Sequence, residues 1–277
     1  HLGHSFPTRR SSDLQSSGAD ELFRRPLGTA NAYYYHLFPP EHGYPVDAPL
    51  AKLHSLLAFL RSSPGASSGL ILARNDLPNS NTPIYTTVVT SFALHASLLS
   101  SAESLRTTHP GLERFALAAS LNADRWTRGT LSLPPSAQLY LPATKSWIQV
   151  PKQETKLEDE FSYLTAALTD RFEPSFVIAP FRSSTSTHPP TTPSVDLVVI
   201  RPLRDLATFA LERAGDGEKA RESFVARIWA TMGGAYKGGS HVDEVGENNE
   251  GVVEYYRVRS FQWAPVGSFL GRVLGHG

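Results

Sequence analysis

Short runs of apolar and β-branched residues, separated by polar turns, recur along most of this chain. These runs predict strands at 69–73, 84–94, 129–133, 138–141, 146–150, 176–179, 195–200 and 252–263. The pattern of 161–168 fits either a helix or a strand. Within 252–263 the alternation changes phase, so we expect a β-bulge at Ser260. Many short strands with few helices favour a β-sandwich in an α+β protein.

Helical spacing of apolar residues is confined to fewer segments. It predicts helices at 32–38, 50–61, 100–106, 111–122 and 203–232, the last interrupted near Gly215 and Gly217. A Ser/Gly/Pro stretch at 62–68 indicates a domain boundary. We therefore expect a small domain at 15–65 and a larger one at 66–277. The Ser/Thr/Pro-rich residues 183–194 predict a flexible loop in the larger domain.

Composition narrows the classes of protein that the chain can belong to. Its 277 residues are 40% hydrophobic and 19% charged, which is typical of a globular protein. Lysine and arginine balance aspartate and glutamate at 26 each, so no overall field favours nucleic acid. No apolar run is long enough for a transmembrane segment. The chain contains no cysteine, which excludes disulfides and thiol nucleophiles and weakly favours a cytoplasmic location.

The most informative motif is the Pro-Leu-Gly-Thr-Ala-Asn-Ala string at 26–32, directly before the first predicted helix. Gly28 allows close approach of a ligand to the backbone, and Thr29 and Asn31 offer a hydroxyl and an amide. Free backbone N–H groups at a helix start favour anions, so the turn suits a nucleotide phosphate. The alternative is a glycine-containing loop in which Asn31 only caps the helix.

A second cluster of charged residues lies about seventy positions downstream. Glu103 and Arg106 are three residues apart on one predicted helix face, and Arg114 lies opposite the apolar face of the next helix. Both arginines suit contact with phosphate groups, because charge-assisted hydrogen bonds are strong. The alternatives are a surface ion pair between Glu103 and Arg106 and a solvated Arg114.

Both segments resemble motifs of the diacylglycerol kinase-like lipid kinases, the superfamily of sphingoid-base, ceramide and diacylglycerol kinases. The 26–32 string is similar to their second nucleotide-binding motif, and 102–115 is similar to their Ser-Glu-x-x-Arg-x-x-Gly-x-x-Arg-Phe segment. The resemblance covers about residues 22–265, is closest to fungal members, and makes 161–168 a strand. It implies that Gly28, Thr29, Asn31, Glu103, Arg106 and Arg114 bind ATP. It also implies Mg²⁺, a lipid substrate with a primary hydroxyl, and transient contact with membrane surfaces.

The chain departs from the family pattern at three places. It lacks the Gly-Gly-Asp-Gly-Thr loop that carries the family's catalytic aspartate, so no catalytic residue is assigned. It ends without the family's Val-Asp-Gly segment, and Ser97 and Leu99 replace acidic residues that meet the amine of sphingosine. Residues 4–14 resemble the translation of a sequencing adapter, so we expect 1–14 to be a disordered artefact. We expect a truncated, inactive kinase fragment with a remnant of the α/β nucleotide-binding domain. The alternative is a non-catalytic lipid-binding or regulatory β-sandwich.

Two further segments suggest chemistry only weakly. Residues 232–240 are glycine-rich, but they lack the Gly-Lys-Ser/Thr ending of a phosphate loop, so we interpret them as a helix-to-strand turn. His241 lies near Asp243 and Glu244 without a second histidine, which favours surface polarity over a metal site. Asp196 precedes an apolar run and is interpreted as a turn residue.

Overall fold

The computed structural model describes residues 31–43, 53–61, 71–78, 80–183, 185–247 and 250–266 of the 277-residue chain. The helices are α1 (Ala32–Leu37), α2 (His54–Arg61), α3 (Ala93–Ser104), α4 (Glu113–Ser120), α5 (Leu206–Arg213) and α6 (Gly217–Ala235). The strands are β1 (Ala73–Asn75), β2 (Ile84–Thr86), β3 (Val89–Phe92), β4 (Thr127–Ser132), β5 (Gln138–Leu141), β6 (Ser146–Gln149), β7 (Lys156–Phe161), β8 (Tyr163–Ala167), β9 (Val195–Ile200), β10 (Glu254–Val258) and β11 (Gln262–Pro265). Short 3₁₀ turns are η2 (Pro40–His42), η4 (Lys152–Glu154), η5 (Pro180–Arg182), η6 (Pro202–Arg204) and η7 (Ser240–Asp243).

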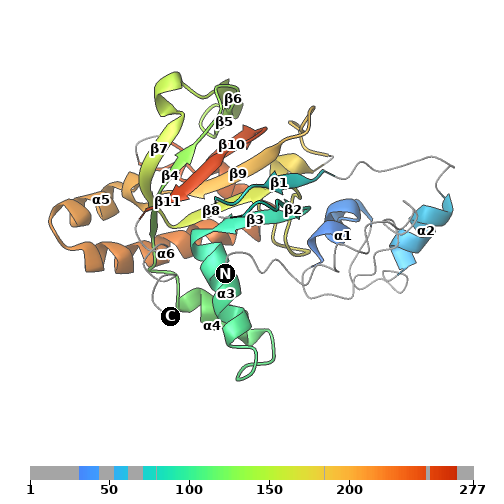
Figure 1. The fold of residues 1–277 in the computed structure, drawn as a ribbon, viewed down its shortest axis with the longest axis horizontal. Coiled ribbons are helices and arrows are strands. Elements are labelled where there is room, and N and C mark those ends of the chain that lie inside the picture. The colour runs from blue at the N-terminus through green and yellow to red at the C-terminus, as the bar shows by residue number, and fades with distance from the viewer. Residues whose placement is uncertain are drawn as a thin grey trace.

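The strands form three antiparallel sheets, so the α+β class is confirmed (Figure 1). A six-stranded sheet has the order β3-β8-β9-β10-β5-β6, and a three-stranded sheet has the order β11-β4-β7. A two-stranded ribbon pairs β1 with β2. Strand β9 lies in the middle of the large sheet, where Val198 is paired with Tyr255 of β10 and with Thr165 of β8.

The middle strands of the large sheet, β8 and β9, are buried on both faces. On one face, Leu164, Leu197 and Val199 belong to the same hydrophobic cluster as Leu131 and Phe161 of the small sheet. On the opposite face, its side chains pack against helix α6, through contacts that include Tyr163, Val198, Ile200, Tyr255, Phe224, Ile228 and Met232. Burial on both faces explains why β9 is almost continuously apolar, since neither face meets water.

Several predicted strands differ from the structure. The run 84–94 divides into β2 and β3 and then turns into α3 at Ala93, whose φ of 49° is in the left-handed region. No glycine or proline marks that turn, so the strand pattern concealed the helix start. The run 252–263 is two strands in different sheets, and the chain crosses between sheets near Ser260 instead of forming a bulge within one strand.

Two other segments of the sheet region were also misassigned. Residues 176–179 form no strand, because their amides bond elsewhere: Val177 donates to Ala235 and Ala179 donates to Asp170. Strand β7 was not predicted, since its sequence Lys-Leu-Glu-Asp-Glu-Phe is mostly charged. It pairs with β4 along its whole length and buries only Leu157 and Phe161. The strand interpretation of 161–168 is confirmed by β8.

The helix predictions after residue 200 agree well with the structure. Helices α5 and α6 are separated near Gly215, which has a φ of 81°. The boundary at 62–68 lies outside the described residues, as do residues 1–14. Within 183–194, the residues that the structure describes form turns and bends without helix or strand. Among the described helices, none has the length and apolar character needed to span a bilayer.

Candidate functional site

Asn31 is the only one of the three predicted residues in the glycine-containing motif that the structure describes, because Gly28 and Thr29 lie outside the described residues. Its side-chain oxygen accepts a hydrogen bond from the Tyr34 amide at 3.3 Å, so Asn31 caps α1. The cap is part of the alternative interpretation, and a nucleotide-binding role for Asn31 stays a prediction. The cap also shows that the motif leads directly into a helix start.

Helix α1 is short and depends on packing. A small aromatic cluster is formed by Tyr34, Tyr35 and Phe38. Leu37 of α1 and Ala58 of α2 pack against it. The rings of Tyr34 and Phe38 lie 5.1 Å apart between centroids. Six residues are too few for a helix to be stable alone in water, so tertiary contacts must hold α1 in place.

One polar contact of α1 is an ion network with the segment that follows β8. His36 Nδ1 lies 2.8 Å from Asp170 Oδ1. Arg171 donates from Nε and Nη2 to Asp170 Oδ2 at 3.0 and 2.9 Å, and from Nη1 to the Pro174 carbonyl at 3.1 Å. Arg171 also pairs with Glu41, with one oxygen 3.0 Å from Nη1. We call His36, Glu41, Asp170 and Arg171 the junction network.

Two charges of the junction network are removed from water. The side chains of Asp170 and Arg171 are 1% and 2% exposed, whereas that of Glu41 is 51% exposed. Burial alone would raise the pKa of the Asp170 carboxyl, but hydrogen bonds from His36 and Arg171 outweigh burial and lower it. The junction network therefore joins α1, which follows the predicted nucleotide-binding motif, to the large sheet. Figure 1 shows α1 beside the end of the sheet that carries β8 and β3.

Glu103 and Arg106 form a surface ion pair at the end of α3, as the alternative interpretation expects, and their contact with ATP stays a prediction. Arg106 Nη1 donates to the two carboxylate oxygens of Glu103 at 3.0 and 3.3 Å. Their side chains are 57% and 61% exposed, so the pair contributes about 0 to 1 kcal/mol to stability. Because so little holds Arg106 to Glu103, its guanidinium can turn toward an incoming anion at small cost.

Arg114 is more constrained than a solvated side chain. Its Nη1 donates to the carbonyls of Pro110 and Gly111 at 3.0 and 2.5 Å, and its guanidinium lies 4.4 Å from the centre of the Phe115 ring. The half-buried side chain thus closes the turn between α3 and α4. This arrangement leaves the other guanidinium nitrogen for a ligand, but it also gives Arg114 a structural role.

The structure brings together only some of the predicted residues. Glu103 and Arg106 touch each other, and Arg114 lies on the neighbouring helix of the same α3–α4 pair. Figure 1 shows this helix pair projecting from the sheet, away from α1, whose first turn Asn31 caps. The two candidate ATP-binding segments therefore lie at separate places beside the sheet.

A buried polar cluster lies at the start of α3, and nothing in the sequence pattern indicated it. His95 of α3 hydrogen-bonds Ser91 at 2.6 Å, and its ring packs 5.1 Å from Phe172 and 6.0 Å from Tyr163. Burial lowers the pKa of His95 to about 4, so the ring is neutral at pH 7. The buried hydroxyls of Tyr163 and Thr165 on β8 interact with each other, and neither hydrogen-bonds another group among the described residues. Phe172 is two residues from Asp170, so this cluster adjoins the junction network.

Asp196 is a buried acid and not a turn residue, so that interpretation was wrong. It lies within β9 at 0% exposure, where Arg257 donates to both its oxygens at 2.9 and 3.0 Å. Tyr255 donates its hydroxyl to the same carboxylate at 2.7 Å, and Arg182 lies 3.5 Å away. His241 is also buried, at 1% exposure, with Nε2 3.1 Å from the Ile178 carbonyl, so its interpretation as surface polarity was wrong too.

A second ion cluster connects β10 with β7 and η6. Arg201 donates two hydrogen bonds to Glu254 at 2.7 and 2.8 Å and a third to Asp159 at 3.0 Å. Arg204 lies 3.3 Å from Glu254 and donates to the Gly251 carbonyl at 3.3 Å. Burial would raise the pKa of Glu254, but the two arginines lower it below its usual range.

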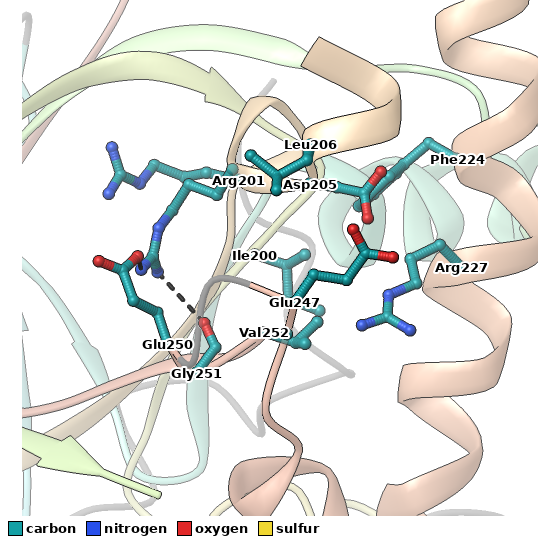
Figure 2. Close-up of a pocket in the computed structure, with 12 residues that line it drawn as sticks. Ile200, Arg201, Asp205, Leu206, Phe224, Arg227, Glu247, Glu250, Gly251 and Val252 are labelled. Carbon is teal, nitrogen blue, oxygen red and sulfur yellow. Dashed lines mark hydrogen bonds and ion pairs between the residues drawn. The ribbon is translucent and has the colours of Figure 1, made fainter. Parts of the chain in front are cut away.

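The arginines of this cluster border a small cavity of about 100 Å³. Figure 2 shows Glu250 and Gly251 on one side of the cavity and Arg227 and Glu247 on the other, and Glu250 is paired with Arg204. Ligand pockets usually measure several hundred Å³, so this volume suits a few water molecules and not a nucleotide. The mixed charges around it give an incoming anion no clear advantage.

The described residues differ in how well they suit the expected ligands. The exposed guanidinium of Arg106 is chemically suited to a phosphate of ATP. Within the described ranges, no group of three or more histidine, cysteine, aspartate or glutamate side chains is placed to hold a metal ion. Comparison of the chain with protein-family models gives no match, and comparison with curated proteins finds no relative.

Proposed function

We propose that this chain is part of an ATP-dependent lipid kinase that phosphorylates a primary hydroxyl of a sphingoid base, ceramide or diacylglycerol-like lipid. The observation that carries the proposal is the junction network. It fastens the helix that follows the Gly-Thr-Ala-Asn-Ala motif to an antiparallel sheet domain through Asp170 and Arg171. A kinase of this kind needs such a connection, because a nucleotide-binding segment and a substrate-side domain must be held in register.

The finer fold that we infer is a β-sandwich attached to a remnant of a nucleotide-binding domain. The shared core of the three- and six-stranded sheets supports the sandwich. The motif and α1 would belong to the nucleotide-binding remnant, within residues 15–65. The sheets, with residues 66–277, would form the substrate side.

The charged residues of the proposed site have chemical roles in phosphoryl transfer. Phosphoryl transfer spreads negative charge over the phosphate oxygens, so positioned cationic donors stabilise the transition state. Arg106 and Arg114 would donate to ATP phosphates, with Glu103 orienting Arg106. Mg²⁺ would arrive with ATP and neutralise part of its charge. The chain contains no Gly-Gly-Asp-Gly-Thr loop to supply the general base, so these residues alone would bind ATP without transferring phosphate.

The lipid side of the site would lie near the buried polar cluster of α3 and β8. The buried hydroxyls of Tyr163 and Thr165 interact with each other and with no further polar group that the structure describes, so the head group of a lipid would add partners for both. The neutral His95 ring and Phe172 provide apolar surface there. Access to such a substrate requires transient contact with a membrane surface, which is compatible with a cytoplasmic protein.

Substitution of Arg106 by alanine tests the proposal in the longest product of the gene. We expect Arg106→Ala to weaken ATP binding about tenfold or more, because a charge-assisted hydrogen bond contributes about 1.5 to 3 kcal/mol. Arg128→Ala is the matched control, since Arg128 is an exposed arginine on β4 of the three-stranded sheet and is not assigned to the ATP site. Unchanged ATP affinity in Arg106→Ala would remove the phosphate role from this residue.

The sequence upstream of the codon for Gln15 separates the kinase from the alternative. A reading frame that encodes a Gly-Gly-Asp-Gly-Thr loop supports the kinase. A start codon without that loop supports a non-catalytic lipid-binding or regulatory sandwich.

A further inference from the structure

A groove of about 530 Å³ lies where the 187–194 connection passes strands β5, β6 and β10. Its volume is within the range of small-molecule sites in proteins. The groove is lined by Ser136, Gln138, Trp147, Thr187, His188, Pro189, Thr191, Thr192, Ser194, Arg257, Val258 and Arg259. None of these lining residues is acidic, whereas two are arginines and five carry hydroxyl groups. The composition of the lining therefore favours an anion.

The two arginines of the groove differ in their charge balance. Arg257 is held by two hydrogen bonds to the buried Asp196 and stacks 4.6 Å from the centre of the Trp147 ring. The carboxylate of Asp196 therefore largely neutralises the positive charge of Arg257. Arg259 is exposed, and it makes no ion pair or side-chain hydrogen bond with any residue that the structure describes. Arg259 therefore presents an uncompensated cation to the groove.

Two buried donors at the groove also lack partners. Ser194 is 7% exposed, and its hydroxyl makes no hydrogen bond within the described ranges. The same holds for the indole N–H of Trp147. A buried polar group without a partner costs about 1 to 3 kcal/mol, so such groups are uncommon in folded proteins unless a ligand or water satisfies them.

We propose that this groove binds a phosphate monoester, either a soluble metabolite or the head group of an anionic lipid. The planar guanidinium of Arg259 suits bidentate contact with phosphate oxygens, and the surrounding hydroxyl groups supply further donors. The site uses none of the residues assigned to ATP. The phosphate-site proposal is therefore tested independently of the kinase proposal.

Titration calorimetry with inorganic phosphate and with glycerol 3-phosphate tests the site, together with co-sedimentation on phosphatidylcholine vesicles with and without phosphatidic acid. We expect saturable binding of at least one phosphate source. Arg259→Ala should weaken that binding about tenfold or more, because one charge-assisted hydrogen bond is lost. Ser194→Ala should have a smaller effect in the same direction. Arg213→Ala is the control, since Arg213 is exposed on α5 and does not line the groove.

The arms of the experiment separate the sources of phosphate. Arg259-dependent binding of glycerol 3-phosphate supports a soluble ligand, and Arg259-dependent binding restricted to phosphatidic acid vesicles supports a lipid head group. Absence of saturable binding in every arm overturns the proposal. Binding that is equally strong in wild type and Arg259→Ala, with both proteins showing native circular dichroism, overturns it as well.

Discussion

The junction network should make Asp170 one of the most sensitive charged positions in the chain. Asp170→Ala leaves Arg171, which is 2% exposed, without its buried partner. Breaking one side of a buried ion pair costs about 3 to 5 kcal/mol. Glu41 still contacts Arg171 but is 51% exposed, so it compensates by only about 1 kcal/mol or less. We therefore expect Asp170→Ala to lower the free energy of unfolding by about 3 kcal/mol.

Urea unfolding at pH 7, followed by tryptophan fluorescence, measures this loss as a shift in midpoint at constant slope. Glu103→Ala is the matched control, because Glu103 also pairs with an arginine but is 57% exposed, and it should cost about 0 to 1 kcal/mol. Asp170→Asn should cost less than Asp170→Ala, since it keeps the shape and one acceptor oxygen. The pKa of Asp170 is lowered, so its charge stabilises the fold above its unfolded pKa and this contribution disappears as the pH falls through the folded value.

Hydrogen exchange shows whether the network holds α1 in particular. The Tyr35 amide donates to the carbonyl of the cap residue Asn31 at 3.0 Å, and the Phe38 amide donates to the Tyr34 carbonyl within α1 at 2.8 Å. In Asp170→Ala these amides should exchange faster, while amides of β9 should change only with global stability. A cost similar to that of Glu103→Ala, together with unchanged protection of α1, would refute the junction network as the anchor of this helix.

Three further predictions follow from the packing and burial of other residues. Gly233→Ala should stabilise the protein by about 0.5 to 1 kcal/mol in urea unfolding, because a Cβ there meets open space inside α6. Gly234→Ala should destabilise it by about 1 to 3 kcal/mol, since its Cβ would lie 2.6 Å from the backbone nitrogen of His241. Burial lowers the pKa of His95 to about 4, so the unfolded chain binds the proton first. The free energy of unfolding should therefore fall as the pH is lowered from about 6.5 to about 4. His95→Gln should make this loss smaller by up to about 3 kcal/mol.

These three predictions have clear contrary outcomes. Equal effects of the two glycine substitutions would show that the close approach of α6 to η7 is not maintained in solution. A His95→Gln variant with the same acid dependence as the wild type would show that His95 is accessible to protons in the folded state.

The sequence predicted those features that depend on neighbours along the chain. The cap formed by Asn31 and the ion pair of Glu103 with Arg106 both join residues three positions apart, so local patterns indicate them. The junction network joins residues 134 positions apart, and no periodicity connects His36 with Asp170. Asp196 was misread for a similar reason, because a single acid beside an apolar run resembles a turn residue until its partner Arg257 is placed across the sheet.

Two transitions between elements also could not be predicted from the sequence. Ala93 begins α3 with a left-handed backbone conformation that glycine would normally signal. The chain leaves β10 and joins the other sheet as β11 within four residues, and the apolar pattern continues across that crossing. In both places the tertiary fold decides the backbone path, and local propensity gives the wrong answer.

A phosphoryl-transfer assay decides whether the chain is part of a lipid kinase. The longest product of the gene should be incubated with γ-labelled ATP, Mg²⁺ and micellar sphingosine, ceramide or diacylglycerol, beside Arg106→Ala and Arg128→Ala. The account predicts a labelled lipid phosphate from at least one of the three lipids, at a rate that falls about tenfold or more in Arg106→Ala and is unchanged in Arg128→Ala. Absence of labelled product from all three lipids, with a folded protein that carries the Gly-Gly-Asp-Gly-Thr loop, would contradict it.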